Sequence, residues 1–161
     1  MTLKTLQKRR KQNKTDYGKR LKLLKSGKPR LVIRKTNKYM IAQYVVSDEA
    51  QDKIVLGVTS KDLLKVGLDA KANLKNISTS YLTGVLIGKQ IKDKKLETPI
   101  IDLGMARVLH KTKLFALIKG LQDSGLEVPC DKANFPDEAR IKGEHLKNKI
   151  DVEEIKGKIL N

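Results

Sequence analysis

Positive charge is concentrated at one end of this chain, and that asymmetry limits what the end can fold into. Residues 1–38 hold fifteen Lys and Arg and the single acid Asp16, a net charge of +14, whereas residues 39–161 hold twenty Lys and Arg against seventeen Asp and Glu, a net charge of +3. Repulsion among the N-terminal charges opposes compaction, so we expect a basic arm over residues 1–27 that is stable against an anionic partner. Nucleic acid fits best, because residues 1–30 lack the bulky apolar face of a membrane-surface helix.

The composition of the whole chain points to one domain with a small aliphatic core. The chain has 161 residues, of which 39% are hydrophobic and 4% aromatic. Cys130 is the one cysteine, so an internal disulfide is excluded and a reducing compartment is expected. The longest apolar runs are too short to span a bilayer, and the charged start does not lead into a signal peptide. We therefore expect a soluble cytoplasmic protein.

Three short strands are predicted after the arm. The segment "DYGKRLKLLKSG" is typical of a helix with Asp16 or Thr15 as N-cap and Gly27 as the stop. Alternation and β-branched residues then predict strands over 30–35, 38–47 and 53–60, joined by tight connections at Asn37-Lys38 and at "DEAQD". Short connections between successive strands predict an antiparallel meander.

The hydrophobic period changes in the second half of the chain. Residues 77–96 show helical spacing with Ser78 or Thr79 near the cap, 98–104 form a short buried strand, and 111–125 form a second amphipathic helix ended by Gly125. A helical turn and a polar loop are expected over 61–76, and a short helix from Pro136. The fold class is therefore α/β, with a mixed sheet of an antiparallel three-stranded meander and a parallel strand, covered by helices.

The predicted domain organisation has three parts. Residues 1–27 are the basic RNA-binding arm, residues 28–146 the α/β domain, and residues 147–161 a C-terminal tail that a weak amphipathic pattern allows to be helical.

Sequence motifs for catalysis fail on spacing. In "GVLIGKQ" three residues separate Gly84 from Gly88 where a phosphate-binding loop needs four, and Gln90 stands where a hydroxyl should bind magnesium. We interpret these small residues as part of a helix that packs closely against a sheet. His110, His145 and Cys130 lack the spacing of a zinc site.

A two-metal nuclease is also disfavoured. Asp102 follows a predicted strand, but the first strand carries Arg34 and Lys35 where acidic ligands should stand. We therefore expect no enzyme activity, no metal and no cofactor.

A binding surface is the better interpretation of the same strands. Arg30, Arg34, Lys35 and Lys38 lie on or beside the first strand, with Tyr39 and Tyr44 on the next. Cations hold phosphates and tyrosines stack on bases, although charges on an edge strand also serve to prevent edge-to-edge pairing. Together with the arm, they favour RNA binding.

The segment "KTDYGKRLKLLKSGKPRLVIRKTNKYMIAQ" resembles the signature of the universal large-subunit ribosomal protein eighteen family in its archaeal form, which is related to eukaryotic large-subunit protein five. The matching residues include "TDY" at 15–17, Arg20, the leucines 21, 23 and 24, Ser26 and "KPR" at 28–30. Further similarity lies in "YLTG" at 81–84, "IIDLG" at 100–104, "LFALIKGLQDSGLEVP" at 114–129 and "PDEARIKGEH" at 136–145.

The resemblance implies a mixed α/β fold and a structural role: binding 5S ribosomal RNA and helping to attach it to the large subunit at the central protuberance. The implied partners are 5S RNA, the large ribosomal RNA, a second 5S-binding ribosomal protein and other large-subunit proteins, with no membrane. The alternative is a non-ribosomal RNA-binding or RNA-processing factor of the same architecture. From the residue pattern and the resemblance together, we expect these residues to contact RNA: Lys8, Arg9, Arg10, Lys11, Lys14, Thr15, Tyr17, Arg20, Lys28, Arg30, Arg34, Lys35, Asn37, Lys38, Tyr44, Arg107, His110 and Lys111.

Overall fold

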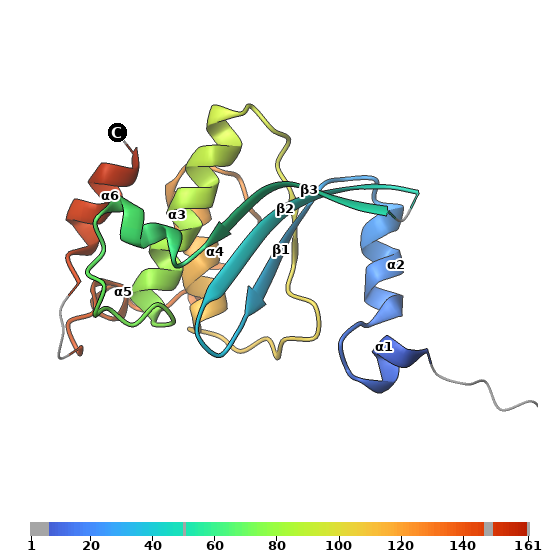
Figure 1. Ribbon diagram of the computed structural model, residues 1–161, viewed down its shortest axis with the longest axis horizontal. Coiled ribbons are helices and arrows are strands. Elements are labelled where there is room, and N and C mark those ends of the chain that lie inside the picture. The colour runs from blue at the N-terminus through green and yellow to red at the C-terminus, as the bar shows by residue number, and fades with distance from the viewer. Residues whose placement is uncertain (1–6, 50, 147–149, 161) are drawn as a thin grey trace, which may run out of the picture.

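The computed structural model describes residues 7–49, 51–146 and 150–160, and it contains a four-stranded mixed sheet with helices packed against it (Figure 1). Within these residues no helix is long and apolar enough to cross a bilayer. The α/β class expected from the sequence is confirmed.

The basic arm forms two short helices before the sheet begins. Helix α1 spans Lys8–Lys11 and helix α2 spans Tyr17–Lys25. Asp16 is the N-cap of α2, because its Oδ1 accepts hydrogen bonds from the backbone N–H of Gly18 at 3.0 Å and of Lys19 at 3.3 Å. Gly27, which follows the helix, has φ 67°. Glycine adopts this left-handed conformation without the steric strain that a Cβ would cause, so it is suited to end the helix. The predicted cap and stop are confirmed.

The sheet has the strand order β3-β2-β1-β4. Strand β1 spans Arg30–Lys35, β2 spans Met40–Asp48, β3 spans Gln51–Thr59 and β4 spans Ile100–Asp102. The first three are antiparallel neighbours, and β4 pairs in parallel with β1, as the sequence predicts. The turn between β2 and β3 is shorter than predicted, because Asp48 and Gln51 still pair across the hairpin.

The helices that follow the hairpins pack either on the sheet or on one another. They are a 3₁₀ turn η1 at Asp62–Val66, α3 at Ile77–Asp93, α4 at Lys113–Asp123, a 3₁₀ turn η2 at Lys132–Asn134, α5 at Glu138–Lys142 and α6 at Val152–Leu160. Ser78 and Thr79 lie near the cap of α3, as the sequence predicts, but the N-cap itself is the residue before the helix. Asn76 caps the helix by accepting from the backbone N–H of Thr79 at 2.7 Å, while Ser78 and Thr79 are buried inside the first turn.

Two aliphatic clusters form the core. The first lies between the sheet and helices α3 and α4, and includes Leu31, Ile33 and Leu117. The second joins α3 to η1, α5 and α6, with Leu82 on α3 and Ile155 on α6 among its buried members. Helix α6 therefore packs into the core, so the tail expected from the sequence is helical over Val152–Leu160.

Helices α3 and α4 approach closely where glycines face each other's backbone. A Cβ added to Gly84 would lie 2.1 Å from the Leu117 carbonyl oxygen, and one added to Gly120 would lie 2.2 Å from the Tyr81 carbonyl oxygen. The sequence interpretation placed this close packing against the sheet. The structure corrects it: the small residues of α3 face α4.

Alanine at Gly84 or Gly120 should therefore lower the free energy of unfolding by about 2 kcal/mol or more, because the new methyl group meets backbone and forces the helices apart. Gly157 on α6 is a matched control, because a Cβ there meets nothing within 4 Å. Gly157→Ala should therefore raise the free energy of unfolding by about 0.5–1 kcal/mol, through the higher helix propensity of alanine. Urea unfolding followed by circular dichroism measures both. Equal effects at the three glycines would contradict the close approach.

Candidate nucleic-acid interface

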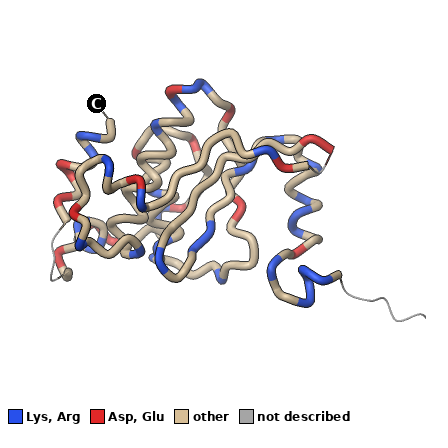
Figure 2. Tube along the Cα trace, in the orientation of Figure 1, with Lys and Arg blue, Asp and Glu red and all other residues tan. Residues whose placement is uncertain are grey.

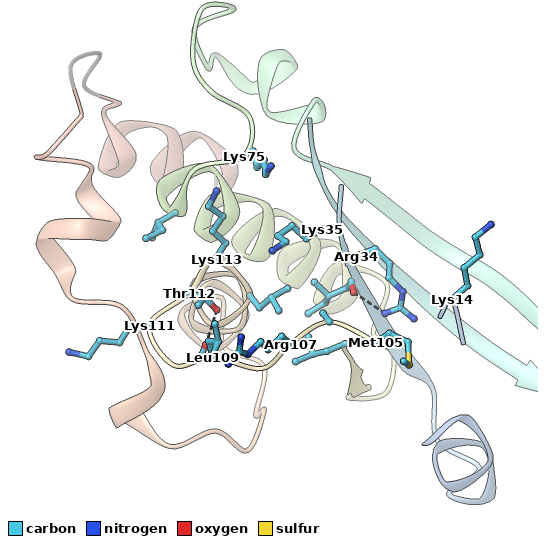
Figure 3. A pocket seen from close by; sticks show the side chains of 15 residues that line it. Lys14, Arg34, Lys35, Lys75, Met105, Arg107, Leu109, Lys111, Thr112 and Lys113 are labelled. Atoms are coloured by element: carbon cyan, nitrogen blue, oxygen red, sulfur yellow. Dashed lines mark hydrogen bonds between the residues drawn. The ribbon is translucent and has the colours of Figure 1, made fainter. Parts of the chain in front are cut away.

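A groove of about 790 Å³ opens where the arm, the sheet and the start of α4 meet (Figure 3). Strand β1 contributes Ile33, Arg34 and Lys35 to its wall, and the loop after β4 contributes residues between Leu103 and Lys111. The arm reaches it through Lys14, and the segment before α3 through Lys75. Elements distant in the sequence therefore build one surface, which we call the cationic groove.

The groove is lined by cations and by no acid. Seven of its fifteen lining residues carry positive charge, namely Lys14, Arg34, Lys35, Lys75, Arg107, Lys111 and Lys113. Two of them are partly neutralised: Arg34 lies 3.4 Å from the Asp102 carboxylate, and Lys111 lies 3.1 Å from that of Asp137. Among the described residues, no ion pair is recorded for the other five. An anion would relieve their mutual repulsion.

Lys113 shows that repulsion most directly. The pKa of the Lys113 ammonium is lowered below its usual value, mainly by partial burial and to a smaller extent by repulsion from Lys75 and Lys35. Both causes disfavour the charged form, and both would be offset by a phosphate in the groove. The groove is thus suited to bind an anion.

Apolar side chains stand among these cations. Ile33 and Leu114 are buried at the base of the groove, whereas Met105 is 41% exposed and Leu109 is 47% exposed on the loop after β4. Cations beside exposed apolar groups match the chemistry of a nucleotide, which has an anionic phosphate and flat, weakly polar sugar and base faces.

The arm continues the basic surface away from the sheet (Figure 2). None of the four residues of α1 is buried, and all four are Lys or Arg. The turn between the two helices is held by the Arg9 Nε–H, which donates to Thr15 Oγ1 at 2.9 Å. The arm therefore presents an ordered array of cations next to the groove.

Most residues expected to contact RNA are accessible. Thirteen of the eighteen are exposed: Lys8, Arg9, Arg10, Lys11, Lys14, Tyr17, Lys28, Lys35, Asn37, Lys38, Arg107, His110 and Lys111. Thr15, Arg20 and Arg34 are partly buried. His110 is oriented by the protein, because its Nδ1 hydrogen-bonds Asn134 Oδ1 and its ring stacks on Phe115 with centroids 6.2 Å apart.

Arg30 lies on β1, as the sequence predicts, but its side chain is buried and not presented to solvent. Only 2% of it is exposed, and its guanidinium donates to Asp52 Oδ1 at 2.6 Å, to Ser47 Oγ at 2.9 Å and to Asp102 Oδ2 at 3.2 Å. These acceptors use the donors that a bidentate RNA contact would need. Asp102, considered above as a metal ligand, instead pairs with Arg30 and Arg34.

Tyr44 is also buried, with 2% exposed. It belongs to the first core cluster, and its hydroxyl donates to the Glu97 carbonyl at 2.9 Å. The burial of Tyr44 could have been predicted from the sequence, since Met40, Ala42 and Tyr44 alternate along β2 and therefore share one face. Arg30 and Tyr44 are therefore both buried, and neither lines the cationic groove.

Two groove cations, Lys75 and Lys113, were missed. Lys75 lies in an irregular segment and Lys113 in the first turn of α4, and the fold alone brings both next to Lys35. Nothing in their local sequence distinguishes them from other lysines.

An ordered array of cations beside a cationic, partly apolar groove on a mixed α/β body is typical of small RNA-binding proteins. The comparisons with known proteins agree. The family model described as ribosomal large subunit proteins 60S L5 and 50S L18 matches residues 2–99. The large ribosomal subunit protein uL18 of Thermoplasma acidophilum is 39% identical over 148 residues, which cover 92% of this chain and 90% of that protein. The chain belongs to this family and is a structural protein of the large ribosomal subunit.

If the groove cations repel one another in the free protein, removing one should stabilise the fold. Lys113→Met keeps the aliphatic stem but not the charge, so its melting temperature should rise at low salt, and the gain should shrink at 1 M salt as screening increases. Lys71→Met, at an exposed position outside the groove, is the control and should change stability by no more than about 0.5 kcal/mol. A salt-independent gain would indicate added apolar packing instead of relieved repulsion.

Proposed function

We propose that this protein binds 5S ribosomal RNA through the arm and the cationic groove, and helps to attach that RNA to the large subunit. The observation that carries the proposal is the groove itself: seven cations and no acid line it, and Lys14 joins it to the arm. Family membership supports the ribosomal setting.

In this proposal residues 1–27 are an RNA-binding arm, residues 28–146 are the 5S-RNA-binding domain, and residues 147–161 are a C-terminal tail. The groove binds phosphates on its lysines, and its apolar loop contacts sugar or base faces. The large ribosomal RNA and neighbouring large-subunit proteins, including a second 5S-binding protein, are the other partners. The role is structural, with no reaction and no cofactor.

The proposal is tested by binding to purified 5S RNA in competition with an unrelated RNA of the same length. Preference for 5S RNA supports it, and equal affinity for both RNAs would reduce the claim to nonspecific RNA binding. Mass spectrometry of gradient-purified large subunits adds a second test. A processing factor would be substoichiometric there, whereas a structural component is present at one copy per subunit.

The groove lysines should matter more than lysines elsewhere. We expect Lys75→Gln with Lys113→Gln to weaken 5S RNA binding and to reduce the slope of log affinity against log salt by about 2, since each phosphate contact contributes about 1. The matched double variant Lys71→Gln with Lys94→Gln removes the same charge at exposed positions outside the groove. Equal losses in the two variants would mean that bulk charge, and not the groove, binds the RNA.

The arm should contribute a separate share of the electrostatic binding. Because α1 buries none of its residues, replacing Lys8, Arg9, Arg10 and Lys11 by Gln should lower the melting temperature only slightly, through loss of the exposed Arg9–Thr15 hydrogen bond and Arg10–Asp16 ion pair. The salt slope of 5S RNA binding should become shallower, by up to about 4 if each residue contacts a phosphate. Filter binding at several salt concentrations measures the slope. If log affinity falls with log salt at the same slope in this variant and in the unmodified protein, α1 does not contact the RNA phosphates.

A further inference from the structure

A row of alternating charges joins the arm to the sheet. Arg20 on α2 lies 2.9 Å from Asp52 on β3, and Asp52 lies 2.6 Å from Arg30 on β1. Arg30 lies 3.2 Å from Asp102 on β4, which in turn lies 3.4 Å from Arg34 in the groove. The two acids thus alternate with three guanidinium groups across four elements.

Helix α2 has little apolar attachment of its own. None of its nine residues is buried, Leu21 is 55% exposed, and Leu23 and Leu24 are only partly buried. In Figure 1 the helix stands beside the end of the β2–β3 hairpin, away from the helices that cover the sheet. The Arg20–Asp52 ion pair therefore connects a weakly packed helix to the sheet.

Two side chains of the sheet orient the carboxylate of Asp52. Its Oδ1 accepts from Arg30 Nη2 at 2.6 Å and from Ser47 Oγ at 2.7 Å, which leaves Oδ2 to meet Arg20. Partial burial opposes ionisation, but the hydrogen bonds from Ser47, Arg20 and Arg30 outweigh it and hold the pKa of Asp52 below its usual value. The carboxylate is charged at neutral pH, and one of its oxygens is directed at the arm.

We propose that Asp52 is a positioning residue for RNA binding: it fixes α2 against the sheet, and so sets the distance between the cations of the arm and those of the groove before RNA arrives. This rests on the proposed function. A binding surface that is already ordered in the free protein loses less conformational entropy on association, so the same cations bind RNA more tightly than they would on a mobile arm. Asp52 thereby favours binding to a polyanion although it carries the same sign of charge.

That opposition of sign gives a sharp test. By bulk electrostatics alone, removing an acid from a protein that binds RNA should leave affinity unchanged or raise it. If Asp52 positions the arm, Asp52→Asn should instead weaken 5S RNA binding by about tenfold. Asp48→Asn is the matched control, because Asp48 is an exposed acid of the same hairpin and the substitution removes the same charge. It should bind RNA at least as tightly as the unmodified protein.

The alternative role for Asp52 is to neutralise buried Arg30, and a double-mutant cycle separates the two. Arg20→Gln removes the arm's side of the link and leaves Asp52 paired with Arg30. If Asp52 acts through Arg20, adding Asp52→Asn to Arg20→Gln should cause little further loss of affinity. A full additional loss in that background would overturn the positioning role and assign the effect to Arg30.

Hydrogen exchange on the free protein tests the docking without RNA. Amides of residues 17–25 should exchange faster in Asp52→Asn and in Arg20→Gln, while those of β1 and β2 keep their protection in Arg20→Gln. Asp48→Asn should change neither. Unchanged exchange in α2 for both variants would overturn the proposal. If Asp52→Asn unfolds, Arg20→Gln still decides it, and failure of the unmodified protein to prefer 5S RNA would count against the proposed function alone.

Discussion

The buried guanidinium of Arg30 is the constraint around which the rest of the structure is arranged. A charge with 2% exposure is costly to desolvate unless carboxylates lie close to it, and here Asp52 and Asp102 supply them from two other strands. Ser47 on β2 adds a third acceptor. One side chain at the start of β1 therefore ties together all four strands, and breaking one pair would leave an uncompensated charge inside the protein.

The same arrangement explains how a chain of net charge +17 keeps a stable body. On the side of α5 and α6, cations are matched by nearby acids, as in Lys142 with Glu153 at 2.9 Å and Lys119 with Glu138 at 3.9 Å. In the arm and the groove that matching is incomplete (Figure 2). An anion bound in the groove would relieve the repulsion there, so RNA binding and folding stability are linked at this surface.

Local signals allowed most of the fold to be predicted. The alternation of Arg30–Lys35 gave β1 its bounds, and the Asp16 cap and Gly27 stop bounded α2, because caps and periodicity act over a few residues. The sequence located the start of α3 but did not single out Asn76 as its N-cap, because Asn76, Ser78 and Thr79 are all good capping residues. The burial of the Arg30 side chain was not predictable, since its three acceptors lie 17, 22 and 72 residues away. Lys75 and Lys113 became recognisable only when the fold brought them together.

The arginines that link the arm to the sheet and the lysines that line the groove have different roles. The guanidinium groups of Arg20, Arg30 and Arg34 are all engaged with carboxylates, as suits a planar group with several donors that can bridge elements. The lysines at 35, 75 and 113 line the groove, and among the described residues no ion pair is recorded for them. An ammonium on a flexible stem adapts to a phosphate without a fixed geometry, which suits the part of the surface that must accommodate RNA. Arg20, Arg30 and Arg34 therefore set the shape of this surface, whereas Arg107 and the lysines at 35, 75 and 113 supply charge that an RNA backbone can neutralise.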